Sequence, residues 1–186
     1  QPVDIIVAAH TGVARVVMNA TRTIPIVMAV SADPVADGLV KSLPHPGGNV
    51  TGLSIMTDDV AGKRLELLRE AIPGLARVGI MLDADFDRWE ADFRQNEAAG
   101  RTLGLELLPL KVRGPDDFAG AFKTARDSGA GAVILMQSFM LGTNGKLLAE
   151  LALANRMPTM FGTGERTFAR AGGLMNYGAS IPESWY

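Results

Sequence analysis

The chain has 186 residues, 47% of them hydrophobic and 20% charged, and its formal net charge at pH 7 is -2. This length and composition are typical of a globular protein with a substantial core, and the charge balance gives no basic surface for nucleic acid. The chain has no cysteine and two histidines far apart, His10 and His45, which excludes disulfides and thiolate sites and does not favour a histidine metal site. We therefore expect no metal, no cofactor and no nucleic-acid partner.

The N-terminal part of the chain predicts two successive strand–helix units. Residues 2–9 and 24–30 are rich in branched apolar side chains, which is typical of strands covered on both faces of a parallel sheet. A helix follows the first strand, with Thr11 as its expected N-cap. A short helix over residues 33–42 follows the second, with Pro34 in its first turn. Such units indicate a doubly wound parallel sheet.

A proline- and glycine-rich stretch follows, and it forbids a continuing helix at Pro44, Pro46, Gly47 and Gly48. We interpret this stretch as a crossing between two lobes. The predicted domains are residues 1–48 as a partial first lobe, 49–177 as a second lobe and 178–186 as a return crossing toward the first.

The second lobe alternates apolar runs with amphipathic segments, which predicts another parallel α/β sheet. The expected strands are residues 77–82, 105–112, 132–136, 159–162 and 173–177. The expected helices are residues 58–71, 88–103, 117–128, 141–155 and 165–170.

Four segments carry a family resemblance: SADPV, PGGNVTGLS, GKRLELLREAIPGLARVGIM and AGGLMNYG. They resemble the ABC transporter substrate-binding protein family that includes tryptophan- and tyrosine-binding members, and the likeness runs over nearly the whole chain. The resemblance implies two α/β lobes of the periplasmic binding protein type I-like kind, the first of them incomplete because family members are longer. It also implies an amino acid ligand, aromatic in some members, in a cleft between the lobes.

The same resemblance implies partners and a location. The partners would be an ABC permease and its ATPase, and the location would be periplasmic or extracellular, with an export signal or lipid anchor expected upstream of Gln1. An incomplete first lobe would expose a sheet edge, so self-association of this chain is a further expectation.

Candidate ligand contacts follow from the rule that open α/β sheets bind ligands beyond the carboxyl ends of their strands. The polar and aromatic residues expected there could contact the carboxylate, the ammonium group and the side chain of a small zwitterion. They are Thr11, Ser31, Asp33, Asp83, Gln137, Ser138, Phe139, Thr163 and Tyr177.

Most of these residues also have a purely structural interpretation. Thr11 and Asp33 would serve equally well as helix caps, and Asp83 as a cap or a solvated acid. Phe139 could belong to the core, and Tyr177 could pack at a hinge. Gln137 and Ser138 favour a ligand more strongly, because polar side chains that end an apolar strand need hydrogen-bond partners.

The sequence contains neither a nucleophile–base arrangement nor a phosphate-binding loop, so we expect a binding protein and not an enzyme. Two alternatives stay open at this point. One is the ligand-sensing domain of a transcription regulator, which shares the two-lobed architecture, and the other is a small α/β enzyme.

Overall fold

The computed structural model describes residues 3–31, 33–54, 60–86, 88–162 and 167–178. The chain divides into two compact units, Gln1–Asp58 and Asp59–Tyr186, called unit 1 and unit 2 below. Both have a parallel sheet, as the sequence predicts; in the described residues one helix packs against the sheet of unit 1 and several against that of unit 2. No helix in the described ranges has both the length and the apolar character needed to cross a membrane.

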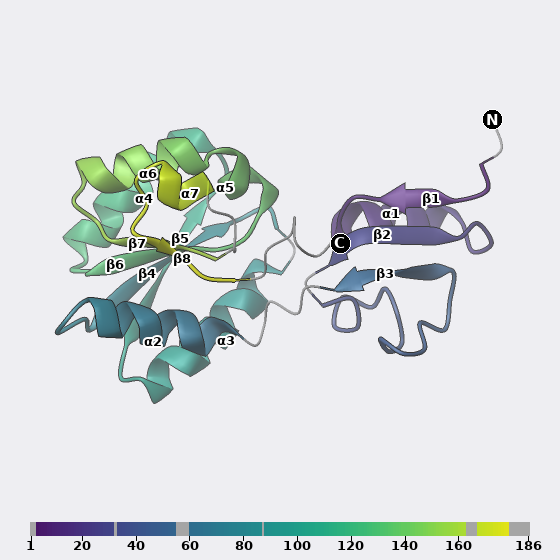
Figure 1. The fold of residues 1–186 in the computed structure, drawn as a ribbon, viewed down its shortest axis with the longest axis horizontal. Coiled ribbons are helices and arrows are strands. Elements are labelled where there is room, and N and C mark those ends of the chain that lie inside the picture. Colours follow the sequence, from purple (N-terminus) through teal and green to yellow (C-terminus); the bar gives the residue numbers. More distant parts are fainter. Residues whose placement is uncertain (1–2, 32, 55–59, 87, 163–166, 179–186) are drawn as a thin grey trace. The chain divides into compact units, whose positions relative to one another are not determined.

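Unit 1 is a three-stranded parallel sheet in the order β1-β2-β3 (Figure 1). The strands are β1 (Ile6–Ala8), β2 (Ile26–Ser31) and β3 (Val50–Ser54), and helix α1 (Thr11–Ala20) connects the first two. Alternate strand residues point to a small core shared with α1. That core contains Ala8, Ala14, Ile26, Met28, Leu39, Val40 and Val50.

The predicted lobe boundary at residues 48 and 49 is wrong, because β3 belongs to the first sheet. Val50 pairs with Ile26, so the strands on either side of Gly47 and Gly48 are neighbours in one sheet. Gly52 allows the close approach at the irregularity between them. Its φ is +148°, and a Cβ there would lie 2.0 Å from the backbone oxygen of Met28. The predicted return crossing over 178–186 lies almost wholly outside the described residues.

The predicted helix over residues 33–42 is also wrong, since this segment forms turns. The Asp37 N–H donates to the Asp33 carbonyl and the Leu39 N–H to the Pro34 carbonyl, which closes a single helix-like turn. Gly38 then adopts a left-handed φ of +69°, which ends the turn before a helix can propagate.

Unit 2 is a five-stranded parallel sheet in the order β5-β4-β6-β7-β8. Its strands are β4 (Arg77–Asp83), β5 (Glu106–Val112), β6 (Ala132–Leu135), β7 (Thr159–Phe161) and β8 (Met175–Asn176). Its helices are α2 (Ala61–Ala71), α3 (Trp89–Thr102), α4 (Pro115–Asp127), α5 (Phe139–Thr143), α6 (Gly145–Ala154) and α7 (Thr167–Arg170). The single helix expected over 141–155 is therefore two helices that meet at Asn144.

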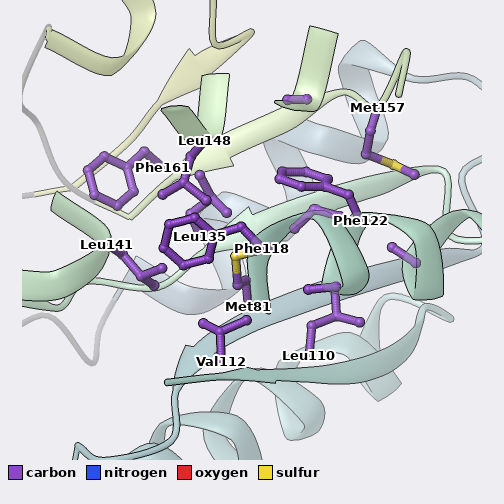
Figure 2. Packing of buried hydrophobic residues seen from close by; sticks show 14 of the residues in the cluster. Met81, Leu110, Val112, Phe118, Phe122, Leu135, Leu141, Leu148, Met157 and Phe161 are labelled. Carbon is purple, nitrogen blue, oxygen red and sulfur yellow. The ribbon is translucent and has the colours of Figure 1, made fainter. Parts of the chain in front are cut away.

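Helices cover both faces of this sheet, so unit 2 is doubly wound as predicted (Figure 1). α2 and α3 bury Leu65, Leu68 and their neighbours against one face. α4, α5, α6 and α7 pack on the other face, where Phe118 and Phe122 meet strand residues such as Leu135 (Figure 2). Consecutive apolar residues in β4 and β6 are required because both sides of each strand are buried.

Candidate functional site

The sheet of unit 2 has a topological switch point between β4 and β6. The chain passes from β4 to β5 on one side and later places β6 on the other side of β4. Connections on the two sides of such a point diverge, and open α/β sheets bind ligands in the crevice beyond the strand ends there. Asp83 ends β4, and Gln137 follows β6 after Met136, whose N–H donates to the Met81 carbonyl. These two predicted site residues therefore flank the switch point.

Asp83 supports its local turn with one oxygen. Its Oδ1 accepts a hydrogen bond of 3.1 Å from the Asp85 N–H, and the side chain is half-buried. A carboxylate has two oxygens with several acceptor positions, so this local bond leaves acceptor capacity for an ammonium group.

Ser138 and Phe139 begin the short helix α5 and behave differently from each other. The Ser138 hydroxyl accepts a hydrogen bond of 3.1 Å from the Leu141 N–H, so Ser138 is the N-cap of α5. Phe139 is 84% exposed, so the alternative that it belongs to the core is wrong. An exposed phenyl ring beside the switch point offers an apolar surface to a ligand side chain.

Tyr177 follows β8 and is 37% exposed. Its backbone is fixed on both sides: the N–H donates to the Phe161 carbonyl at 3.1 Å, and the carbonyl accepts a bond of 2.9 Å from Arg64 Nε. Thr163 lies outside the described residues.

Arg64 on α2 was not among the predicted site residues, although its side chain is only 2% exposed. Besides the Tyr177 carbonyl it binds the Gly162 carbonyl, with an Nη2–O distance of 2.7 Å. The sequence carries a signal for this burial, since Arg64 shares the helical stripe of Ala61, Leu65 and Leu68.

A second polar group next to the switch point lies at the start of α3, the helix that follows β4. Arg88 and Asp92 form an ion pair with an Nε–Oδ1 distance of 3.6 Å, and both side chains are largely buried. Asn96, one turn further, lies 3.8 Å from the Met136 sulfur at the end of β6. These residues were not predicted, because none of them follows directly after a strand: Asp92 and Asn96 lie within α3 and Arg88 is its N-cap.

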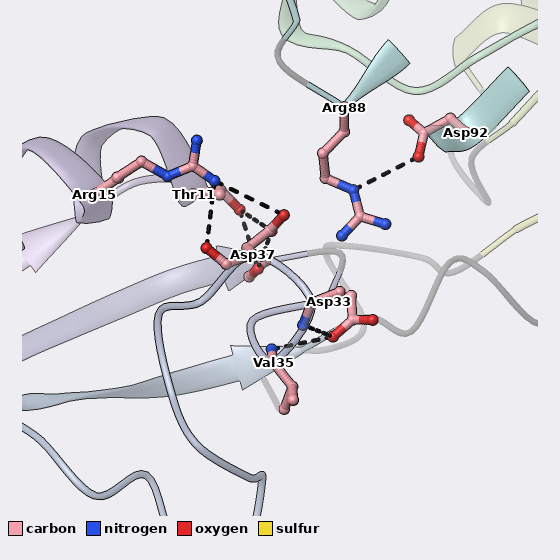
Figure 3. A network of polar contacts seen from close by, with 9 residues as sticks. Thr11, Arg15, Asp33, Val35, Asp37, Arg88 and Asp92 are labelled. Atoms are coloured by element: carbon pink, nitrogen blue, oxygen red, sulfur yellow. Dashed lines mark hydrogen bonds and ion pairs between the residues drawn. The ribbon is translucent and has the colours of Figure 1, made fainter. Parts of the chain in front are cut away.

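In unit 1 the structure brings Thr11 and Ser31 together at the carboxyl ends of β1 and β2, with 3.0 Å between their hydroxyl oxygens (Figure 3). Asp37 Oδ2 accepts from both hydroxyls, at 3.4 and 3.5 Å, and its carboxylate is 2% exposed. Arg15 on α1 donates to the Asp37 carbonyl. Thr11 is thus not the N-cap of α1, because His10 takes that position and Thr11 faces the acid.

Asp33 caps the turn that follows it, where the sequence predicted a helix cap or a ligand contact. Its Oδ1 accepts from the Val35 and Ala36 N–H groups at 3.1 and 2.9 Å (Figure 3). Neither Asp37 nor Arg15 was predicted, because the side chains meet only through the turn that Gly38 ends. Among the described residues, no group of three or more acidic or histidine side chains could hold a metal ion.

A family model described as ABC transporter substrate binding protein matches residues 1–183. A tyrosine-binding protein of Clostridioides difficile strain R20291 is 44% identical over 78 residues, which are 42% of this chain and 22% of that protein.

Solved structures show the same fold at low identity. A conserved domain protein of Vibrio cholerae has a TM-score of 0.86 at 21% identity, over 98% of this chain and 60% of its own. An ABC domain from Streptococcus pneumonia, solved with L-Trp, has a TM-score of 0.78 at 23% identity, over 91% of this chain and 56% of its own. The chain thus spans less than two thirds of each of these proteins. The predicted α/β fold with a parallel sheet in each of two units is confirmed.

Proposed function

Because this chain belongs to the ABC transporter substrate-binding protein family, we propose that it captures a small solute, specifically an amino acid with an aromatic side chain. The names of two similar proteins, one tyrosine-binding and one in complex with L-Trp, support this ligand class.

The arrangement at the β4–β6 switch point carries the proposal. It supplies a half-buried acid at Asp83, an amide at Gln137 and an exposed ring at Phe139. Tyr177, one strand beyond β7, adds a partly exposed phenol. An acid suits an ammonium group, and rings suit the apolar part of an amino acid.

The proposed activity is binding without chemical conversion. Proteins of this family belong to ABC importers, so we propose an ABC permease and its ATPase as partners and a periplasmic or extracellular location. The expected lipid anchor remains a prediction of the resemblance.

We also propose that the chain self-associates through the open face of unit 1. Val3, Ile5 and Val7 alternate along β1 and the residues before it, and Val7 is 70% exposed. Parallel sheets normally cover both faces, so an apolar face of this kind favours a partner surface.

A panel of the natural amino acids, measured by thermal shift and then by calorimetry on the full chain, tests the ligand class. We expect L-tyrosine or L-tryptophan to raise the melting temperature, because a ligand that binds only the folded state stabilises it. Phe139→Ala should weaken binding of the aromatic ligand by about fivefold, the equivalent of one aromatic contact of about 1 kcal/mol.

Leu153→Ala is the matched control, since it removes another exposed apolar side chain from unit 2, on α6. It should leave the dissociation constant unchanged. If no amino acid raises the melting temperature of the chain, the proposed function is wrong.

A further inference from the structure

Arg64 is the largest side chain that unit 2 buries completely, and it binds the backbone at two separate strand ends. Its Nη2 donates to the carbonyl of Gly162, directly after β7, and its Nε donates to the carbonyl of Tyr177, directly after β8. One residue of α2 therefore fixes the exits of two neighbouring strands, which are about a hundred positions away in sequence.

The packing around Gly162 leaves little room for a side chain. A Cβ on Gly162 would lie 3.2 Å from the Leu135 carbonyl oxygen, 3.4 Å from Arg64 Cζ and 3.5 Å from the Gln137 nitrogen. The guanidinium thus lies beside Gly162, whose N–H donates a hydrogen bond to the carbonyl of Leu135 at the end of β6. Its neighbours are the segments that carry Gln137 and Tyr177.

A buried guanidinium on the inner face of a helix has a high free-energy cost of desolvation. A guanidinium remains charged at any pH that proteins tolerate. Its transfer from water costs several kcal/mol, which its hydrogen bonds must offset. An apolar side chain of similar volume would avoid this cost but would leave the Gly162 and Tyr177 carbonyls without these donors. The planar fork of Arg64 provides direction instead, because its donors fix where two carbonyls point.

We propose that Arg64 is a positioning residue of the ligand site: it holds the Gly162 and Tyr177 carbonyls so that the Tyr177 side chain meets the ligand in one geometry. This role rests on the proposed amino acid binding at the strand ends of unit 2. Arg64 itself is too deeply buried to contact the ligand.

The test compares Arg64→Met, Arg64→Lys and Gly162→Ala in the full chain, with L-tyrosine and L-tryptophan as probes. We expect Arg64→Met to weaken binding at least tenfold, and its melting temperature should also fall because the Gly162 and Tyr177 carbonyls lose a donor. Arg64→Lys, which can keep one of the two hydrogen bonds, should weaken binding less. Gly162→Ala should also weaken binding, because the added Cβ would lie 3.2 Å from the Leu135 carbonyl oxygen and would shift the Gly162 backbone that Arg64 holds.

A local readout separates positioning from general stability. In Arg64→Met, amide hydrogen exchange should rise at Tyr177 and its neighbours while the cores of α4 and β4 stay protected. Arg69→Met is the matched control, because this exposed arginine on the same helix binds the Leu103 carbonyl away from the strand exits. It should leave affinity unchanged.

Each outcome has a defined meaning. If the unmodified chain binds neither probe, the proposed function fails before Arg64 is tested. If the unmodified chain binds and all three variants keep the dissociation constant within about twofold, the positioning role is overturned, whatever their melting temperatures. If Arg64→Met does not fold, Arg64→Lys and Gly162→Ala decide the question by the same criterion.

Discussion

The two units fix the carboxyl ends of their strands with buried groups of opposite charge. In unit 1 the carboxylate of Asp37 accepts hydrogen bonds from the Thr11 and Ser31 hydroxyls. In unit 2 the guanidinium of Arg64 donates to the carbonyls of Gly162 and Tyr177. The acid therefore orients side chains that can themselves contact a ligand, whereas the arginine orients backbone and leaves the side chains free to adapt. The carboxyl ends of parallel strands can thus be fixed either through side chains or through backbone carbonyls.

The units also differ in how their sheets are covered. Unit 2 has an apolar cluster on each face of its sheet. Unit 1 has one small cluster, shared with α1, while the opposite face exposes side chains such as Ile5 and Val7. Since burial of apolar area is the main favourable term in folding, unit 2 should hold most of the stability of the chain.

The largest expected effect is from a substitution in the core of unit 2. Phe118 is fully buried between α4 and the sheet, and Phe118→Ala should lower the free energy of unfolding by about 3–5 kcal/mol. Urea unfolding followed by tryptophan fluorescence measures it, because Trp89 packs against a core cluster of unit 2. Phe139→Ala, at an exposed position, should change the same free energy by less than about 0.5 kcal/mol. Equal effects of the two substitutions would contradict the packing described for unit 2.

The buried strands of unit 2 could be predicted because their sequences are unambiguous. Val78, Ile80, Met81 and Leu82 occupy nearly consecutive positions of β4, a pattern that only a strand covered on both faces requires. The residues after these strands could be selected as candidate ligand contacts for the same reason. Once a strand is predicted, its carboxyl end is also known, and ligands bind beyond that end. Asp83 and Gln137 were selected in this way, and their contact with a ligand stays a prediction.

The errors occurred where a long-range contact overrides a local signal. Prolines and glycines before Val50 indicate a break in the chain, but only pairing with β2 assigns that strand to unit 1. The type of residue at Arg64 suggests exposure, whereas its helical position places it inward. Asp37 reaches Thr11 and Ser31 because Gly38 ends the turn, and no periodicity encodes that geometry.

A substitution of intermediate effect tests the open face of unit 1. Ile5→Thr combined with Val7→Thr removes apolar surface and keeps β-branched side chains, so the strand propensity is retained. If this face associates, sedimentation velocity should show at least a tenfold weaker self-association of the double variant. Val16→Thr is the control, because Val16 is equally exposed on α1. A chain that sediments as a monomer at all concentrations before substitution would contradict the proposed self-association.

The smallest effect is expected for a charge pair on the surface, in contrast to the buried charges of Asp37 and Arg64. On α4, Lys123 donates to Asp127 one turn later, and this hydrogen bond holds the pKa of Asp127 below its ordinary value. A carboxyl whose pKa is depressed by folding stabilises the folded state above its unfolded pKa, and that contribution disappears as the pH falls through the folded pKa. Lys123→Gln should therefore raise the Asp127 pKa in an NMR titration, with no resolvable change in urea unfolding at pH 7, because solvent screens exposed pairs. Lys146→Gln, which removes the similar pair with Glu150 on α6, should leave the Asp127 pKa unchanged. A large loss of stability in Lys123→Gln would mean that surface charges rival the buried ones, and the contrast between them and the two buried groups would then fail.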